Sequence, residues 1–285
     1  MRWKALWQYL SLQQHLHNHA ADIPTEYNDP FKDPHTHPNT MASTDKKEQR
    51  WFPLESNPTL MNDYIQKWGF DTSKYQFYDV FSTEDWALDM IPQPVSAVIM
   101  LYPLTPPQLA AEKGRDHTSP DADKDSAIWF IRQRIGNACG TIGLLHAIQN
   151  ASPPQTPLPD SWWANFQQQC PTNLDPIAKA AILEGDTQIA QLHEQATSSD
   201  TNATSRGNLD DRVLTHFVAL VHVQGHLYEL DGRQKGPLSH GPTSPKTLLK
   251  DACAVVRQFM DRDPGEVRFT ILALAPTTTS TGAEN

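Results

Sequence analysis

The sequence has few cysteines and no long hydrophobic run. Its three cysteines, Cys139, Cys170 and Cys253, are widely spaced and odd in number, which argues against a disulfide framework or a CxxC metal site. No stretch approaches the ~18 consecutive apolar residues of a membrane helix, and no N-terminal apolar run precedes a small-residue cleavage site. We therefore expect a cytoplasmic protein, with the nucleus as a second compartment, that makes no membrane contact.

An excess of basic residues is also lacking, which argues against nucleic acid as a partner. Residues 1–50 hold six Lys/Arg and six Asp/Glu, so the net charge of −10 belongs entirely to residues 51–285. A region of this charge repels phosphates and favours a basic partner.

The length of 285 residues suits one large domain with an appendage. After a short helical pattern, residues 1–50 are polar, rich in proline and histidine, and without period, which predicts a disordered or loosely helical N-terminal appendage. Alternate histidines at positions 15 to 19 could hold a metal if the segment were extended, but a tail with incidental histidines is the favoured interpretation. Met41 is an alternative start. Residues 51–285 then form the folded domain.

Apolar periodicity in this domain predicts both helices and strands. We expect helices over 58–68, 126–134, 138–149, 174–197 and 245–260. We expect strands over 96–102, 214–223, 226–230 and 267–274. The remaining long segments, 103–124, 151–172 and 198–211, are predicted to be loops, and the last of these to be exposed and mobile.

Cys139 is the first candidate for chemistry. It lies at the start of the helix predicted over 138–149, with Asn137 as the expected N-cap, and the N–H groups and dipole of a helix start favour a thiolate. The alternative is that Cys139 is a small buried hydrophobic residue, as most free cysteines are. We interpret Cys170 and Cys253 as structural, because neither begins a helix.

The second candidate is a histidine and carboxylate pair on a predicted hairpin. If Gln224-Gly225 forms the turn, Val218 faces Asp231, and His216 becomes the diagonal neighbour of Asp231 on the same face. Diagonal side chains start roughly 7 to 8 Å apart, within hydrogen-bonding reach for His and Asp. A histidine oriented in this way can accept a thiol proton and later protonate a leaving amine. The alternative is a surface ion pair on a strand.

Gln133 is the third candidate. It precedes Cys139 on the helix predicted over 126–134, and its side-chain N–H₂ could stabilise an oxyanion together with the Cys139 backbone N–H. Taken alone, it would be a solvated helix residue. The three candidates together indicate a Cys-His-Asp hydrolase.

These residues lie in segments that resemble the ubiquitin C-terminal hydrolases, which are compact papain-related cysteine peptidases. The matching segments are 51–58 (WFPLESNP), 92–103 (PQPVSAVIMLYP), 133–143 (QRIGNACGTIG), 216–233 (HFVALVHVQGHLYELDGR) and 262–274 (RDPGEVRFTILAL), in the family's order. NACGTIG and GHLYELDGR are specific to this family.

The resemblance implies a fold and a set of roles. The fold would be α+β, a papain-related central antiparallel sheet wrapped by helices, with a knotted backbone. Gln133 would contribute to the oxyanion hole, Cys139 would be the nucleophile, His216 the general base and acid, and Asp231 the group that orients His216. The family uses neither a metal nor a cofactor. The chain ends soon after its last predicted strand, which favours a compact monomer.

The resemblance also implies a substrate. A crossover loop, here about residues 198–211, would lie over the active site and limit the leaving group to small adducts and short peptide tails on the C-terminal glycine of ubiquitin. The arginines of the ubiquitin tail suit an acidic enzyme, and its two final glycines suit a narrow cleft. The Trp162-Trp163 segment departs from the family and is interpreted as core or docking surface.

Three other functions remain open from the sequence. A ubiquitin-binding or storage module with little turnover would use the same surface. A hydrolase of another ubiquitin-like modifier would use the same residues. An unrelated Cys-His-Asp acyltransferase would need a cofactor pocket, for which the sequence has no motif.

Overall fold

The computed structural model describes residues 49–113, 115, 127–202, 208–211 and 213–278. The N-terminal appendage predicted over residues 1–50 lies outside this range, except for its last two residues. The described helices are α2 (Pro58–Trp68), α3 (Asp85–Leu88), α4 (Pro106–Lys113), α6 (Cys139–Gln149), α7 (Trp162–Gln169), α8 (Pro176–Gly185), α9 (Thr187–Thr197) and α10 (Leu248–Asp261). The strands are β1 (Tyr75–Asp79), β2 (Ala97–Pro103), β3 (Thr215–Val223), β4 (His226–Leu230), β5 (Leu238–Pro242) and β6 (Thr270–Pro276).

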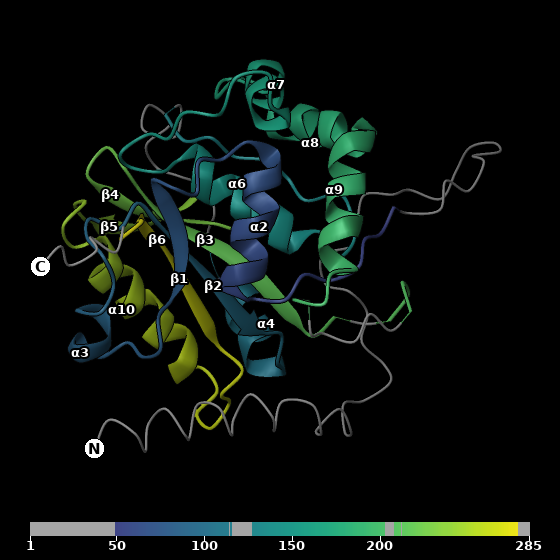
Figure 1. Ribbon diagram of the computed structural model, residues 1–285. Helices are drawn as coiled ribbons and strands as arrows, with labels where there is room; N and C mark the ends of the chain where they lie inside the picture. Colours follow the sequence, from purple (N-terminus) through teal and green to yellow (C-terminus); the bar gives the residue numbers. More distant parts are fainter. Residues whose placement is uncertain (1–48, 114, 116–126, 203–207, 212, 279–285) are drawn as a thin grey trace, which may run out of the picture. The chain divides into compact units, whose positions relative to one another are not determined.

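A six-stranded sheet forms the centre of the domain, with the strand order β1-β6-β2-β3-β4-β5 (Figure 1). Every neighbouring pair of strands is antiparallel. The expected α+β architecture, an antiparallel sheet with helices around it, is therefore confirmed.

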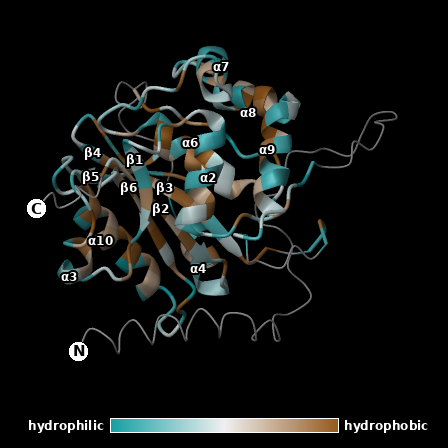
Figure 2. Cartoon of the chain, viewed as in Figure 1, coloured by the Kyte–Doolittle hydropathy of each residue, from teal (hydrophilic) through white to brown (hydrophobic). Residues whose placement is uncertain are grey.

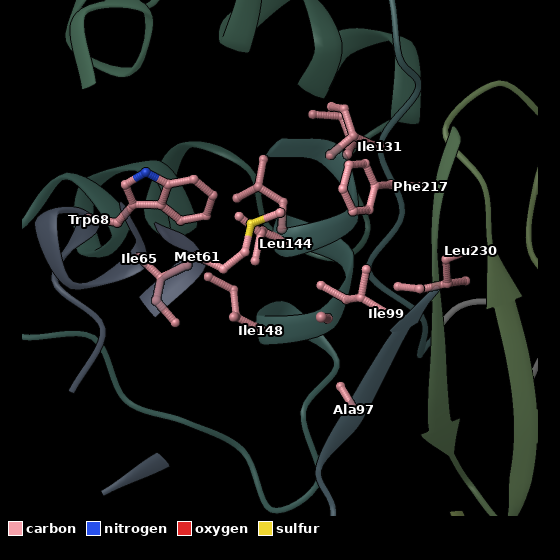
Figure 3. Close-up of a cluster of buried hydrophobic side chains, with 14 of the residues drawn as sticks. Met61, Ile65, Trp68, Ala97, Ile99, Ile131, Leu144, Ile148, Phe217 and Leu230 are labelled. Carbon is pink, nitrogen blue, oxygen red and sulfur yellow. The ribbon is translucent and has the colours of Figure 1, made fainter. Parts of the chain in front are cut away.

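The two faces of the sheet carry separate hydrophobic cores, because side chains of a strand alternate between its faces. On β2, Ala97 and Ile99 pack into one core, while Val98 and Met100 pack into the other. Figure 3 shows part of the first core, where side chains of α2 and α6 meet those of the sheet. Helices α2 and α6 thus cover one face, and α10 covers the other (Figure 1).

Local signals explain where the helices begin and end. The side chain of Asn57 accepts hydrogen bonds from the first turn of α2, Pro58 occupies the first turn, and Gly69 ends the helix with a φ of 100°. In Figure 2, α2 and α9 carry both hydrophilic and hydrophobic colours, as expected of helices with one buried side. Among the described helices, none has the length and apolarity that a membrane span requires.

Three of the element assignments expected outside the active site were wrong. The single helix predicted over 174–197 is divided, because the Asp186 side chain caps α9 directly after α8 ends. The loop predicted over 103–124 contains α4, whose two prolines lie in its first turn and so cost no hydrogen bond. The loop predicted over 151–172 contains α7, whose Trp162 and Trp163 are both buried in the core.

The close approach of α2 to α7 yields a test of this packing. A Cβ added at Gly69 would lie 2.1 Å from the Cβ of Ser161, the N-cap residue of α7, whereas one added at Gly225 would meet nothing within 4 Å. Both glycines have a positive φ. We expect Gly225→Ala to cost about 1 to 2 kcal/mol of unfolding free energy from backbone strain, and Gly69→Ala to cost about 1 to 3 kcal/mol more from overpacking. Urea denaturation followed by tryptophan fluorescence measures both, and equal losses would contradict the packing.

Candidate active site

Cys139 is the first residue of α6, a helix that is buried along nearly its whole length against β2 and β3. The expected cap was wrong: Ala138 is the N-cap residue, no side chain caps the helix, and Asn137 has a left-handed φ of 61°. Because no capping side chain accepts hydrogen bonds from the N–H groups of the first turn, these groups and the positive end of the helix dipole act on the Cys139 thiol.

His216 and Asp231 are joined by a short, buried hydrogen bond. The hairpin has the predicted register, since Ala219 pairs with Leu230 and Val223 with His226. The Nε2 atom of His216 lies 2.6 Å from Oδ1 of Asp231, and the two side chains are 1% and 2% exposed. The alternative of a surface ion pair is therefore wrong.

The orientation of both groups follows from these bonds. Oδ1 of Asp231 also accepts the backbone N–H of Arg233 at 2.8 Å, which fixes the carboxylate. A carboxylate can only accept, so Nε2 of His216 carries the hydrogen. The Nδ1 atom of His216 has no other hydrogen-bond partner within the described ranges and is the nitrogen left for the Cys139 thiol.

The electrostatics of the three groups favour a charged pair. Burial raises the pKa of the Cys139 thiol, but the hydrogen bond and charge of His216, helped by Arg233, outweigh burial and lower it. Burial and Arg233 lower the pKa of His216, but the charge and hydrogen bond of Asp231 outweigh them and raise it. Burial raises the pKa of Asp231, but His216 and Arg233 outweigh it and hold it well below its ordinary value. Both shifts favour a thiolate beside an imidazolium.

Gln133 reaches the site on a segment that is neither helix nor strand, so the helix expected over 126–134 was wrong for its described residues. The backbone N–H of Gln133 donates at 2.8 Å to the carbonyl of Gly232, the residue that follows Asp231. The Gln133 side-chain nitrogen donates to the carbonyl of Ile135 at 3.1 Å, and Oε1 is buried without a partner in the described part of the chain. The side chain thus has one N–H left to donate.

Two residues that sequence reasoning missed hold this segment in place. The Asn150 side chain makes hydrogen bonds of 2.8 Å with both the N–H and the carbonyl of Trp129. His146 of α6 lies 3.2 Å from the N–H of Ile131 through its Nε2 atom, and burial lowers the pKa of this histidine to about 4. The available signals in the sequence were His146, a histidine within an apolar helical pattern, and Asn150, the residue directly after that pattern.

The other two cysteines lack the environment of Cys139. Both are buried, and burial raises the pKa of Cys170 to about 11 and that of Cys253 to about 12. Neither is the first residue of a helix. Their environment fits the structural role expected of them.

The expected crossover segment is only partly described, over 198–202 and 208–211. The expectation that it is exposed throughout was wrong at Asn202, which is 8% exposed. The Asn202 side chain accepts the backbone N–H of Glu55 at 3.0 Å and donates to the carbonyl of Thr197 at 3.1 Å. The start of this segment is therefore attached to the chain that precedes α2.

A thiol at a helix start, beside an imidazole that a buried carboxylate orients, defines a cysteine hydrolase. A family model described as ubiquitin carboxyl-terminal hydrolase, family 1, matches residues 51–261. The ubiquitin carboxyl-terminal hydrolase 3 of Arabidopsis thaliana is 39% identical over 238 residues, which cover 83% of this chain and 99% of the relative. The isozyme L1 of Homo sapiens is 34% identical over 222 residues, which cover 78% and 96%. The chain belongs to the ubiquitin carboxyl-terminal hydrolase family.

The fold agrees with this assignment. The crystal structure of the Trichinella spiralis UCH37 catalytic domain bound to ubiquitin vinyl methyl ester matches with a TM-score of 0.65 and 22% identity, over 81% of this chain and 97% of that one.

The opposite pKa shifts predict how the thiol responds to pH. Because the pKa of Cys139 is lowered and that of His216 is raised, the charged pair forms below the ordinary thiol pKa and is lost above the ordinary imidazole pKa of 6.5. We expect Asp231→Asn to lower the His216 pKa and to slow alkylation of Cys139 by iodoacetamide near neutral pH by at least about tenfold, the effect of one pKa unit. Rates measured across pH, with Asp175→Asn at the cap of α8 as the control, check this; an unchanged Asp231→Asn profile would contradict it.

Gly232 offers a second test, of the packing beside Asp231. A Cβ added there would lie 2.7 Å from Cγ2 of Ile142 and 3.0 Å from Cβ of Gln133, so the Gln133 segment would have to move. We expect Gly232→Ala to lower the hydrolytic rate constant by about 10 to 1,000-fold, up to the loss of one oxyanion donor. Gly143→Ala is the matched control, since its Cβ would make only an ordinary 3.5 Å contact with Phe217. Equal rates for the two variants in steady-state assays would rule out the predicted contribution of Gln133 to the oxyanion hole.

Proposed function

We propose that this chain is a thiol-dependent deubiquitinase that cleaves the bond after the C-terminal glycine of ubiquitin, releasing small adducts and short peptide tails. The observation that carries the proposal is the buried 2.6 Å bond between His216 and Asp231, together with the opposite pKa shifts of His216 and Cys139. Membership of the hydrolase family and the net charge of −10, which suits a basic tail, support the substrate.

In the proposed first step, the Cys139 thiolate attacks the carbonyl carbon of the C-terminal glycine. The backbone N–H of Cys139 and the free side-chain N–H of Gln133 would stabilise the oxyanion. His216 then donates its Nδ1 proton to the leaving amine as the carbon–nitrogen bond breaks, which leaves ubiquitin as a thioester on Cys139.

In the second step, water replaces the amine. Neutral His216 accepts a proton from the water, whose oxygen attacks the thioester carbonyl. The carbon–sulfur bond breaks, ubiquitin leaves with a C-terminal carboxylic acid that loses its proton to the solvent, and the thiolate and imidazolium are restored. Asp231 holds His216 in the orientation that both steps need, and remains ionised because its own pKa is held low.

The test is the release of a fluorogenic amide from the C-terminus of ubiquitin. We expect Cys139→Ala and His216→Ala to abolish release, since each removes a group that forms or breaks a bond. Cys253→Ala is the matched control, because it removes a buried thiol outside the site and should cost stability but not turnover.

Two outcomes would contradict the proposal. A native protein that binds ubiquitin but releases no fluorophore would be a storage module. Release from another ubiquitin-like modifier, with none from ubiquitin, would assign the enzyme to that modifier.

A further inference from the structure

The first turn of α6, which carries Cys139, has no capping side chain of its own. A helix start without a cap frays unless tertiary contacts hold it. Because the proposed thiolate depends on this turn, the contacts that hold it bear on the reaction.

One such contact is a chain of hydrogen bonds that leads away from Thr141, in the first turn. Oγ1 of Thr141 lies 3.1 Å from the hydroxyl of Tyr64 and 2.9 Å from Nδ1 of His193. Nε2 of His193 lies 2.8 Å from the carbonyl of Phe52. The chain therefore joins α6 to α2, to α9 and to the segment before α2; these three helices lie on the same side of the sheet (Figure 1).

The Tyr64 hydroxyl also lies 3.3 Å from Nδ1 of His193, so Tyr64, Thr141 and His193 contact one another pairwise. A carbonyl can only accept, so Nε2 of His193 carries a hydrogen; when the ring is neutral, Nδ1 accepts, and the Thr141 hydroxyl at 2.9 Å is nearer to it than that of Tyr64. Thr141 can then accept from Tyr64, whose hydroxyl stays protonated because burial raises its pKa well above the ordinary value. The exposed fractions of Tyr64, Thr141 and His193 are 1%, 0% and 2%, so a lost bond could not be replaced by bulk water.

The segment before α2 also holds the other side of Cys139. The N–H of Trp51 donates to the carbonyl of Gly136 at 2.9 Å, and the N–H of Gly136 donates to the carbonyl of Gln49 at 2.9 Å. The ring of Trp51 packs on that of His193, with 4.3 Å between their centroids. The chain from Thr141 and the loop that leads into Cys139 therefore end on the same short segment.

We infer that Thr141 is a positioning residue for Cys139, acting through its hydrogen bonds with His193 and Tyr64. The inference rests on the proposed function, since it assigns Cys139 as the nucleophile. The hydroxyl holds the first turn of α6, and so the thiol, at the distance and angle that His216 requires.

Thr141→Val removes the hydroxyl and preserves the shape, whereas Thr141→Ser keeps the hydroxyl. We expect Thr141→Val to slow alkylation of Cys139 by iodoacetamide at about pH 6 to 7 by about fivefold, which corresponds to one net hydrogen bond. The kcat for a fluorogenic ubiquitin amide should fall by a similar factor with KM unchanged, while Thr141→Ser stays close to the native protein. Mass spectrometry of the Cys139 peptide gives the alkylation rate.

Thr197→Val is the control, because it removes another buried threonine hydroxyl, one that donates to carbonyls within α9. It should leave both rates unchanged. Native rates in a folded Thr141→Val protein would overturn the inference. An equal loss in Thr141→Ser would also overturn it, since the cause would then be the methyl group.

Two further measurements test the inference if Thr141→Val does not fold or if the native protein does not cleave a ubiquitin amide. If Thr141→Val does not fold, Tyr64→Phe removes the other hydroxyl of the chain; a loss of about twofold supports the inference and a native rate overturns it. Alkylation needs no ubiquitin. Slower alkylation of Thr141→Val, in a protein whose native form cleaves no ubiquitin amide, would support the positioning role and overturn the proposed function.

Discussion

The site depends on the buried hydrogen bond between His216 and Asp231. Burying either charge alone would cost several kcal/mol, and the partner 2.6 Å away offsets much of that cost. The carboxylate needs a second donor, which the backbone of Arg233 supplies, and the imidazolium needs the Cys139 thiolate. The strand pairing of β3 with β4, and the turn after β4, must therefore be held rigidly.

A second buried carboxylate, that of Glu229 on β4, shows how that rigidity is obtained. Glu229 is fully buried and accepts hydrogen bonds from Arg115, after α4, and from His240 of β5 at 2.9 Å. These partners outweigh the effect of burial and lower the pKa of Glu229 to about 2. Removing one partner would leave a buried charge uncompensated. These bonds therefore hold α4, β4 and β5 together at the end of the sheet that carries Asp231.

Part of the fold and most of the candidate site could be predicted from local signals. The apolar periodicity of residues 58–68 located α2, and the Gln224-Gly225 turn predicted the hairpin register, which selected His216 and Asp231 as a pair. The segment 127–134 could not be predicted in this way. Its backbone bonds to Asn150, His146 and Gly232, which are distant in the sequence, and such bonds replace those of a helix.

The sequence by itself determined which residue types could perform thiol chemistry and where the hairpin turns, because these depend on residue identity, on periodicity and on neighbours a few residues apart. The α+β class followed from the resemblance of five segments to one family. Only the tertiary structure decided that His216 and Asp231 are buried rather than exposed, that Gln133 lies outside any helix, and that Thr141 bonds to His193. Each of these depends on contacts between residues far apart in the chain, and burial, which sets the pKa values, is a property of the packed domain alone.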